Sequence, residues 1–383
     1  MNCMKMSMFN EQNMLKDGYT ANRATYLVPV MQNEKKLNLY DTEYTNWAHS
    51  HGFSVKHASY IQLSEDNLSD YLSDYDYGLC FPLNDWTRIW VNDKLTLKLT
   101  LHGCQYDHLM PAYYYYATSR GLRSLFDNPY GQTVDDFIMV LKKFGAFACK
   151  PNNGAGSQGF FKLSYEDECF KINDEKVSAT QIIDFVESHP NYLYTEFINP
   201  SAFFHQFSPL IHTMRVNVLN IHGDAPVIIG SWFRLPSSKG GVQNNVACKA
   251  EEDYNVIVWI DPETGKYQKS CRAYANRIVP EDIHPETGCS ICFDFVEEWK
   301  ALKEDIYGVC KLFNTLEWLG FDIGITDNGP KIMEINTQGG IFYDQVVRPW
   351  MKDSLIGTYF REKLAAIHAL SPEQKAARSK ILR

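Results

Sequence analysis

The segment Lys150-Pro-Asn-Asn-Gly-Ala-Gly-Ser-Gln-Gly-Phe160 decides how the fold of this chain is interpreted. Gly154, Gly156 and Gly159 have the spacing G-x-G-x-x-G, which in a dinucleotide-binding fold is followed by a helix that holds a pyrophosphate. Here Phe160–Tyr165 follows, and its alternating pattern predicts a strand. A Walker A loop is also excluded, because Gly159 is not followed by Lys-Ser/Thr. The segment therefore indicates a strand, a glycine-rich loop and a second strand.

A glycine-rich loop between paired strands can cover phosphate groups. Glycine lets the backbone approach closely, so the loop can offer N–H groups to phosphate oxygens. Lys150, at the end of the first strand, would add a positive charge. From this segment alone, a surface hairpin without a ligand explains the pattern equally well.

A second hairpin carries acidic side chains. The apolar runs Phe321–Thr326 and Lys331–Asn336 flank a segment rich in turn residues. A loop of three residues, 327–329, places Asp322 directly opposite Glu334 on the neighbouring strand.

These two carboxylates share their face of the hairpin with Asn336, because side chains alternate along a strand. Like charges opposite one another are unfavourable unless a cation or a proton lies between them. Oxygen ligands of this kind suit Mg²⁺, which takes one or two carboxylates and completes its shell with phosphate and water. An exposed sheet face with solvated charges is the alternative, and the isoleucines that frame Asp322 and Glu334 favour the magnesium site.

Other charged residues stand in apolar surroundings without a motif of their own. Arg215 and Arg234 lie in or at the end of predicted strands, and a buried arginine needs an anionic partner. Lys94 is by default an exposed helix lysine, and Glu196 ends a strand. The loop 236–245 is rich in Gly, Ser and Asn, which fits equally a loop that contacts the substrate or a surface loop without a ligand.

Composition excludes several classes of protein. The chain has 383 residues and a net charge of −9, which argues against a nucleic-acid partner and weakly against an anionic membrane surface. No apolar run reaches the length needed for membrane insertion, and the first ten residues do not resemble a signal peptide. The ten cysteines are therefore expected to be reduced thiols in a cytoplasmic protein. Cys289 and Cys292 form one C-x-x-C, which is more often an ordinary loop than a metal site when it has no second pair. His205 and His212 are expected to be structural rather than zinc ligands.

The remaining segments predict a mixed α and β chain. The first 90 residues predict a small α/β domain, with strands at Tyr26–Val30 and Tyr77–Phe81 and a helix from Thr42 to Gly52. Residues 371–383 predict a solvated basic tail. Further helices are predicted at Thr133–Gly145, from Ser178, at Phe295–Leu316 and at Asp353–Leu370, and strands at Ala146–Cys149, Tyr192–Ile198, Thr213–Leu219 and Val227–Phe233.

Taken in order along the chain, these motifs resemble the ATP-grasp superfamily, and in particular its sugar-transfer-associated group, found with bacterial surface-polysaccharide genes. The resemblance covers about residues 90 to 350 and rests on five motifs: Asp93-Lys94, the loop after Lys150, Glu196-Phe-Ile198, Thr213-Met-Arg215 and Asp322 with Glu334-Ile-Asn336. It implies an α+β fold in which two α+β lobes, at 91–195 and 196–370, grip ATP after the small α/β N-terminal domain. In this chain Gly240-Gly241 precedes Asn244-Asn245, whereas related proteins usually place an Asp-Asn step before the glycine pair.

The resemblance also implies a role for each motif. The groups expected at the nucleotide are the phosphate-binding Lys94 and Lys150, the flap residues Gly154, Ala155, Gly156, Ser157 and Gly159, and the adenine-side hinge Glu196, Phe197 and Ile198. The groups expected at the chemistry are Arg215, Arg234 and Lys150 as catalytic residues, and Asp322, Glu334 and Asn336 as Mg²⁺ ligands.

The reaction implied is ATP-dependent ligation of a carboxylate to an amine through an acyl phosphate, with release of ADP and phosphate. The expected cofactors are ATP and Mg²⁺, and the expected partners are a small-molecule acid, such as a sugar acid or an amino acid, and an amine. A homodimer is compatible with this interpretation. Two alternatives stay open: an ATP-binding regulator on the same fold, and a dinucleotide-binding oxidoreductase, which the strand after Gly159 disfavours.

Overall fold

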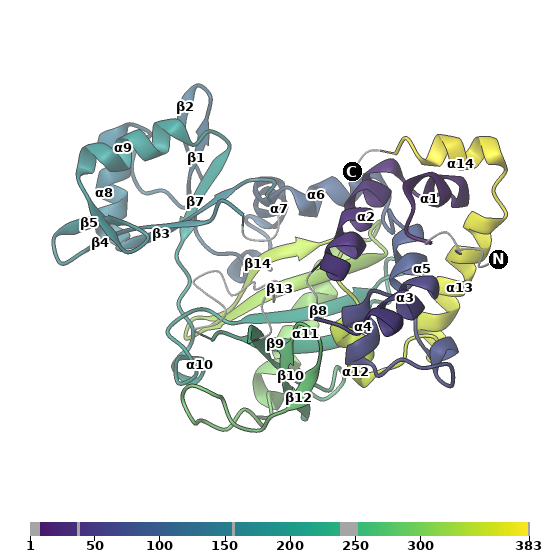
Figure 1. Cartoon of the computed structure of the whole chain (residues 1–383). Coiled ribbons are helices and arrows are strands. Elements are labelled where there is room, and N and C mark those ends of the chain that lie inside the picture. Colours follow the sequence, from purple (N-terminus) through teal and green to yellow (C-terminus); the bar gives the residue numbers. More distant parts are fainter. Residues whose placement is uncertain (1–7, 37–38, 155–157, 238–251, 382–383) are drawn as a thin grey trace.

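The computed structural model describes residues 8–36, 39–154, 158–237 and 252–381. Its strands form two antiparallel sheets of seven strands each. Both sheets and the helices around them are labelled in Figure 1. The predicted mixed α+β class is therefore confirmed.

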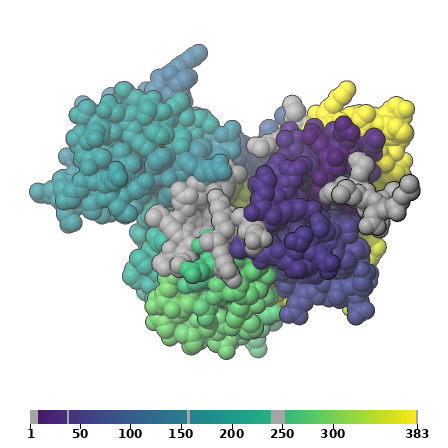
Figure 2. Space-filling model, in the orientation of Figure 1, coloured from purple at the N-terminus to yellow at the C-terminus, as the bar shows by residue number. Residues whose placement is uncertain are grey.

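The first sheet and its two helices form a unit that we call the flap lobe. Its strand order is β2-β1-β7-β3-β4-β5-β6. The bounds are β1 Tyr113–Thr118, β2 Gly121–Ser124, β3 Ala146–Pro151, β4 Phe161–Glu166, β5 Cys169–Ile172, β6 Glu175–Val177, β7 Tyr192–Glu196, α8 Val134–Phe144 and α9 Ala179–Ser188. Figure 2 shows this lobe in teal, projecting from the rest of the molecule.

The two helices of the flap lobe begin where the sequence predicts. Thr133 and Asp136 make reciprocal side-chain to backbone hydrogen bonds at the start of α8, and Ser178 and Gln181 do the same at α9. Both helices bury apolar side chains in one cluster with the sheet. The glycine-rich loop joins β3 to β4, so a strand follows it, as predicted. A dinucleotide-binding helix is therefore absent at this position.

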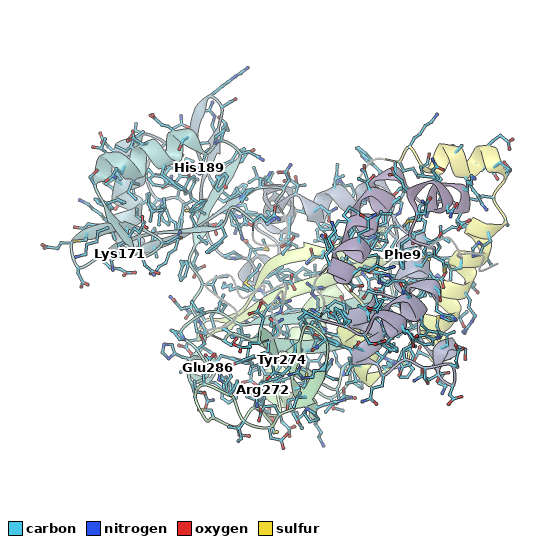
Figure 3. All side chains as sticks on the ribbon, in the orientation of Figure 1. Phe9, Lys171, His189, Arg272, Tyr274 and Glu286 are labelled. Carbon is cyan, nitrogen blue, oxygen red and sulfur yellow. The ribbon has the colours of Figure 1, made fainter. Side chains whose placement is uncertain are left out.

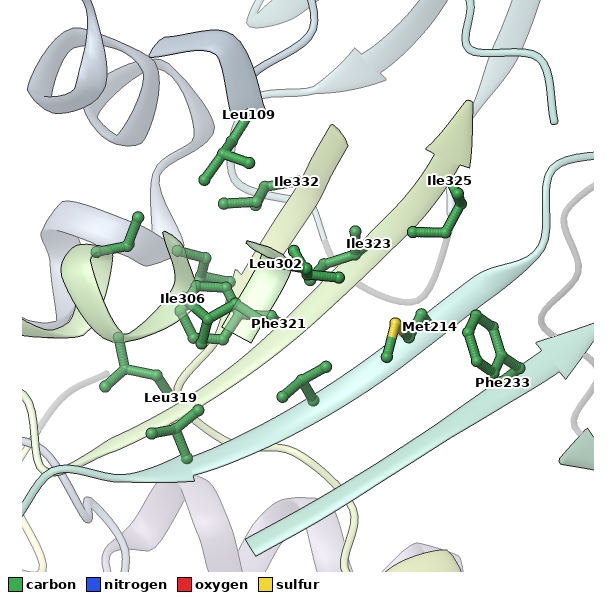
Figure 4. Packing of buried hydrophobic residues seen from close by; sticks show 14 of the residues in the cluster. Leu109, Met214, Phe233, Leu302, Ile306, Leu319, Phe321, Ile323, Ile325 and Ile332 are labelled. Carbon is green, nitrogen blue, oxygen red and sulfur yellow. The ribbon is translucent and has the colours of Figure 1, made fainter. Parts of the chain in front are cut away.

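The second sheet forms the unit that we call the hairpin lobe, with strand order β12-β11-β10-β9-β8-β13-β14. The bounds are β8 Thr213–Leu219, β9 Val227–Leu235, β10 Tyr254–Ile260, β11 Tyr267–Tyr274, β12 Ile278–Pro280, β13 Trp318–Thr326, β14 Gly329–Asn336, α10 Ala202–His205 and α11 Val296–Leu312. Helix α11 buries one apolar face against the sheet, and Figure 4 shows Leu302 and Ile306 packed beside Phe321. Helices α6 (Ile89–Asn92) and α7 (Lys94–Leu101) join the same core through Val91 and Leu97.

The turn of the acidic hairpin differs from the prediction. Thr326 pairs with Gly329 across a turn of two residues, not three, and Gly329 has φ +91°. This shifts the pairing of β13 with β14 by one residue. An irregularity beside Met333 shifts it back, because Ile323 pairs with Ile332 while Asp322 pairs with Glu334. The predicted opposition of Asp322 and Glu334 is confirmed, although the predicted loop length is wrong.

The predicted strands of the N-terminal region are wrong. Every regular element described before β1 is helical: α1 Glu11–Asp17, α2 Ala21–Lys36, α3 Thr42–Ser50, α4 Val55–Tyr60, α5 Asp74–Leu79, α6, α7 and three short turns of 3₁₀ helix at Leu68–Asp70, Trp86–Arg88 and Asp107–Leu109. The run Tyr26–Val30 lies inside α2, where Leu27 is buried and Tyr26 is 60% exposed. A window of five apolar residues shows no period, so it does not distinguish a strand from a helix.

The C-terminal residues extend this helical region. Helices α12 (Phe342–Val347), α13 (Ser354–His368) and α14 (Pro372–Arg378) follow the hairpin lobe. The predicted tail is therefore wrong in part: Ser371 and Gln374 cap α14, and Arg378 donates hydrogen bonds to the carbonyls of Gly18 and Leu79. Phe9, labelled in Figure 3, lies in the shared core of α1, α2, α5 and α13.

Candidate active site

A cavity of about 370 Å³ lies between the two lobes and collects most of the predicted site residues. The predicted residues that line it are Lys94, Lys150, Gly154, Glu196, Phe197, Ile198, Arg215, Arg234, Asp322, Glu334 and Asn336. Gly159 lies beside this wall, against Tyr192 and Pro151. Ala155, Gly156 and Ser157 fall outside the described residues, as does most of the predicted loop 236–245.

Arg215 and Asp322 form an ion pair across β8 and β13. The Nε of Arg215 donates to Oδ1 of Asp322 at 2.6 Å, and Nη2 donates to Oδ2 at 3.1 Å. Asn336, on β14, donates from Nδ2 to Oδ2 of the same carboxylate at 2.9 Å. Asp322 therefore binds both the guanidinium of Arg215 and the carboxamide of Asn336. It lies on β13, which runs between β8 and β14.

Lys94 is tied to the base of the glycine-rich loop. Its Nζ donates to the Gly154 carbonyl at 2.7 Å, and its side chain is 93% buried. Asn152 accepts from the Leu95 backbone N–H at 2.8 Å and donates to Asp93 at 2.6 Å. Asp93 also caps α7. Thus Lys94 is not the exposed helix lysine of the default interpretation, because these three hydrogen bonds join the start of its helix to the loop.

Lys150 and Glu334 both line the cavity, and the charge of each affects the pKa of the other. Burial and the positive charge of Lys94 lower the pKa of Lys150 to about 8, against the attraction of Glu334. Burial raises the pKa of Glu334, and the charges of Lys94 and Lys150 oppose that shift. The Nζ of Lys94 lies 4.0 Å from Oε1 of Glu334. The site therefore concentrates cations around one carboxylate, which suits a ligand that carries several negative charges.

The hinge segment presents backbone rather than a free carboxylate. Glu196 accepts the Ala112 backbone N–H at Oε2, 3.0 Å away, and its own N–H donates to the Ala112 carbonyl at 2.8 Å. Phe197 and Ile198 continue from this anchored position along the cavity wall. Lys162, which the sequence analysis passed over, lies 4.9 Å above the Phe197 ring.

The three predicted magnesium ligands of the hairpin differ in their hydrogen bonds. Both oxygens of Asp322 already accept hydrogen bonds, whereas Glu334 accepts none from the described residues and is 28% exposed toward the cavity. Asn336 donates through its nitrogen, so its amide oxygen stays available. Mg²⁺ commonly takes one or two protein oxygens and completes its shell with phosphate and water. Among the described residues no group of three or more His, Cys, Asp or Glu side chains could hold a metal ion.

Other candidates lie elsewhere. His212 is buried, its pKa is lowered by burial to about 3, and its Nε2 accepts the Ile325 N–H at 3.1 Å. Cys292 is exposed beside Asp282, and Cys289 lies near the Gln206 carbonyl. No helix in the described ranges is long and apolar enough to cross a bilayer.

Two groups that shape the site had no predicted role. Asn152 bonds to Asp93 and Leu95 at the start of α7, and Gln338, Gly339 and Gly340 line the cavity after β14. The glycine pair directly after the predicted metal ligands was a signal that could have been used, since glycine permits close approach of a ligand.

Several solved structures are distantly similar. An L-amino acid ligase from Bacillus licheniformis is 12% identical with a TM-score of 0.39, covering 75% of this chain and 50% of its own. A D-alanine–D-alanine ligase from Bacillus anthracis is 12% identical with a TM-score of 0.38, covering 73% and 68%. A biotin carboxylase from Campylobacter jejuni is 11% identical with a TM-score of 0.38, covering 75% and 48%. This chain thus spans about half the length of the first and third, and at this distance nothing follows about activity.

Comparison with curated protein sequences gave no match. Comparison with protein families matched residues 87–351 to the family described as sugar-transfer associated ATP-grasp. The match contains all the cavity-lining charges described above, and it covers more than half of the sequence. The chain belongs to the sugar-transfer associated ATP-grasp family.

Proposed function

We propose that this protein is an ATP-dependent ligase that joins a carboxylate to an amine through an acyl phosphate. One observation carries the proposal: Lys94, Lys150, Arg215 and Arg234 line the same cavity as the acidic hairpin. Four cations around so small a volume suit a triphosphate, and a carboxylate among them suits its magnesium ion.

Each charged residue that lines the cavity is proposed to have a role that follows from its position. Lys94 and Lys150, at the base of the glycine-rich loop, bind the phosphates of ATP. Arg215 and Arg234, on adjacent strands β8 and β9, hold the transferred phosphoryl group and the acyl phosphate. Glu334 and Asn336 hold Mg²⁺, and Asp322 orients Arg215 and Asn336. Phosphoryl transfer needs mainly such positioning and charge neutralisation, so a covalent nucleophile is unnecessary.

The proposed reaction balances in two steps. A carboxylate oxygen of the acid bonds to the γ-phosphorus of ATP as the bond to ADP breaks. The amine nitrogen then bonds to the acyl carbon, loses a proton to solvent, and phosphate leaves. The acid is proposed to be a sugar acid or an amino acid used in surface-polysaccharide synthesis in the cytoplasm, and the family description supports the link to sugar transfer.

The test measures ADP release from MgATP when the purified chain is supplied with pooled small acids and amines. Wild type should release ADP only when both pools are present, and Glu334→Ala should reduce the rate to background. Mass analysis of the reaction should find an amide. Equal release by wild type and Glu334→Ala would contradict the proposal, and MgATP binding without turnover in any pool would favour an ATP-binding regulator instead.

A further inference from the structure

Helix α12 carries two neighbouring polar residues that are buried and face different parts of the protein. Asp344 is 1% exposed and Gln345 is 0% exposed. A buried carboxylate and a buried carboxamide are costly unless each is bonded, so such residues usually have a specific role.

Asp344 reaches the back of the candidate active site. Its Oδ2 accepts a hydrogen bond from Nδ2 of Asn217 at 2.6 Å, and Asn217 lies on β8, two residues after Arg215. Oδ1 of Asp344 lies against β9, where a Cβ on Gly230 would come within 1.8 Å of it. The absence of a side chain at Gly230 therefore leaves the space that this carboxylate occupies.

Arg215 is bound by Asp322 and lies within reach of the negative charge of Asp344. Asp322 binds its Nε and Nη2. Nη1 of Arg215, which Asp322 does not bind, and Oδ1 of Asn217 both lie beside Gly339, at 3.1 and 3.4 Å from the position of a Cβ on that residue. Burial raises the pKa of Asp344 to about 7, while the charge of Arg215 and the Asn217 hydrogen bond oppose the shift.

Gln345 connects the same helix to the N-terminal helices. Its Oε1 accepts the Leu72 N–H at 2.8 Å, and its Nε2 donates to the Leu72 carbonyl at 2.9 Å. Nε2 also lies 3.2 Å from Nε2 of His57, whose Nδ1 lies 3.0 Å from Asp74. These contacts involve both ends of the Gln345 carboxamide and join α12 to α4 and to the start of α5.

We propose that Asp344 is a positioning residue that helps Asp322 to fix Arg215, and that Gln345 makes the N-terminal helices part of this support. Neither Asp344 nor Gln345 is proposed to touch a substrate. An effect of Asp344 on catalysis rests on the proposed function, whereas its effect on the position of Arg215 does not.

The first experiment observes Arg215 directly in the nucleotide-free chain. The protein is labelled with ¹⁵N-arginine, and the Arg215 Nε–H signal is assigned by its loss in Arg215→Lys. Asp344→Asn keeps the shape and the acceptor for Asn217 but removes the charge. It should shift this signal and speed its exchange with water by roughly threefold or more. An unchanged signal and rate would overturn the proposal.

Matched variants separate positioning from general loosening. Asp353→Asn removes a carboxylate bonded to Arg348 just beyond α12, and it should leave the Arg215 signal unchanged. Gly339→Ala, which crowds Nη1 of Arg215, should shift the signal. Gln345→Met, or the milder His57→Gln if that variant does not fold, should shift it in the same direction as Asp344→Asn. No shift in either variant would refute the role of the N-terminal helices.

The second experiment tests the catalytic consequence with MgADP and aluminium fluoride, which imitates the transferring phosphoryl group. Asp344→Asn should bind MgADP within about twofold of wild type and lose about tenfold of the added affinity that fluoride gives. Loss of both affinities together would indicate a merely structural role and would overturn the assignment. If wild type binds no MgADP, the proposed function is wrong, and the arginine signal still decides the positioning role.

Discussion

The guanidinium of Arg215 and the carboxylate of Asp322 are joined by two hydrogen bonds between β8 and β13, whose Cα atoms pair at this position. Their side chains are 12% and 15% exposed. Asp322 therefore neutralises the buried charge of Arg215. The other positively charged residues that line the cavity are Lys94, Lys150 and Arg234.

Asp322→Asn should destabilise the fold. Removing one partner of a buried ion pair leaves the other charge uncompensated, so the free energy of unfolding should fall by about 3 kcal/mol. Urea unfolding measures the change. The control is Glu263→Gln, which removes an ion pair with Lys303 whose carboxylate is 80% exposed, and its effect should be below about 1 kcal/mol. Equal effects of the two variants would show that the Asp322 carboxylate is not needed to compensate the buried charge of Arg215.

Glu334→Gln should make ATP binding less dependent on magnesium. The variant keeps the shape of the side chain but loses the charge that would hold the ion, so affinity for MgATP should fall by about tenfold. Affinity for ATP in EDTA should stay the same or rise, because a negative charge near the phosphates is removed. Calorimetric titration measures both, with the exposed Glu175→Gln as the control. A parallel loss with and without magnesium would argue against Glu334 as a ligand.

Affinity for MgATP should decrease as the pH rises through the pKa of Lys150. That pKa is lowered to about 8, so the ammonium is charged below this pH and loses its charge above it. Titrations between about pH 7 and pH 9 should show the decrease, and Lys150→Arg, which remains charged, should flatten it. If both proteins show the same slope, another group is responsible for it.

Asn152→Ala should weaken both the fold and nucleotide binding. It leaves the Leu95 N–H and one oxygen of Asp93 without their partner, which should cost about 1–3 kcal/mol of unfolding free energy. Lys94 begins the same helix, so affinity for MgATP should fall as well. The neighbouring Asn153→Ala is the control, because Asn153 makes one exposed hydrogen bond with Asn191. Thermal unfolding and calorimetric titration of the two variants give the comparison.

Local patterns predicted much of the flap lobe and of the hairpin lobe. The caps at Thr133 and Ser178 begin helices because their side chains bond to backbone three residues away. The strand after Gly159 is visible as an alternation in the sequence, and it excluded a dinucleotide-binding loop. The opposition of Asp322 and Glu334 was also predicted, although the turn and the irregularity at Met333 changed the register in compensating directions.

The short apolar runs of the N-terminal region could not be interpreted in the same way. Tyr26–Val30 is part of a helix because Ala24, Leu27 and Met31 face a core completed by α13, more than 300 residues later in the chain. The capping residues Ser371 and Gln374 were visible in the sequence, and they signal the helix that replaces the predicted tail. Arg378 then binds the carbonyls of Gly18 and Leu79, which no local pattern shows.

The sequence by itself identified the candidate phosphate and magnesium ligands and most of the strands that carry them, because strand alternation and helix capping act over a few residues. Only the tertiary structure decided which of them meet. Asp322 binds Arg215, and Asp344 binds Asn217, through strands and helices that lie more than 100 residues apart. Such pairings depend on how whole sheets and helices bury their apolar faces, and that packing is a property of the complete chain.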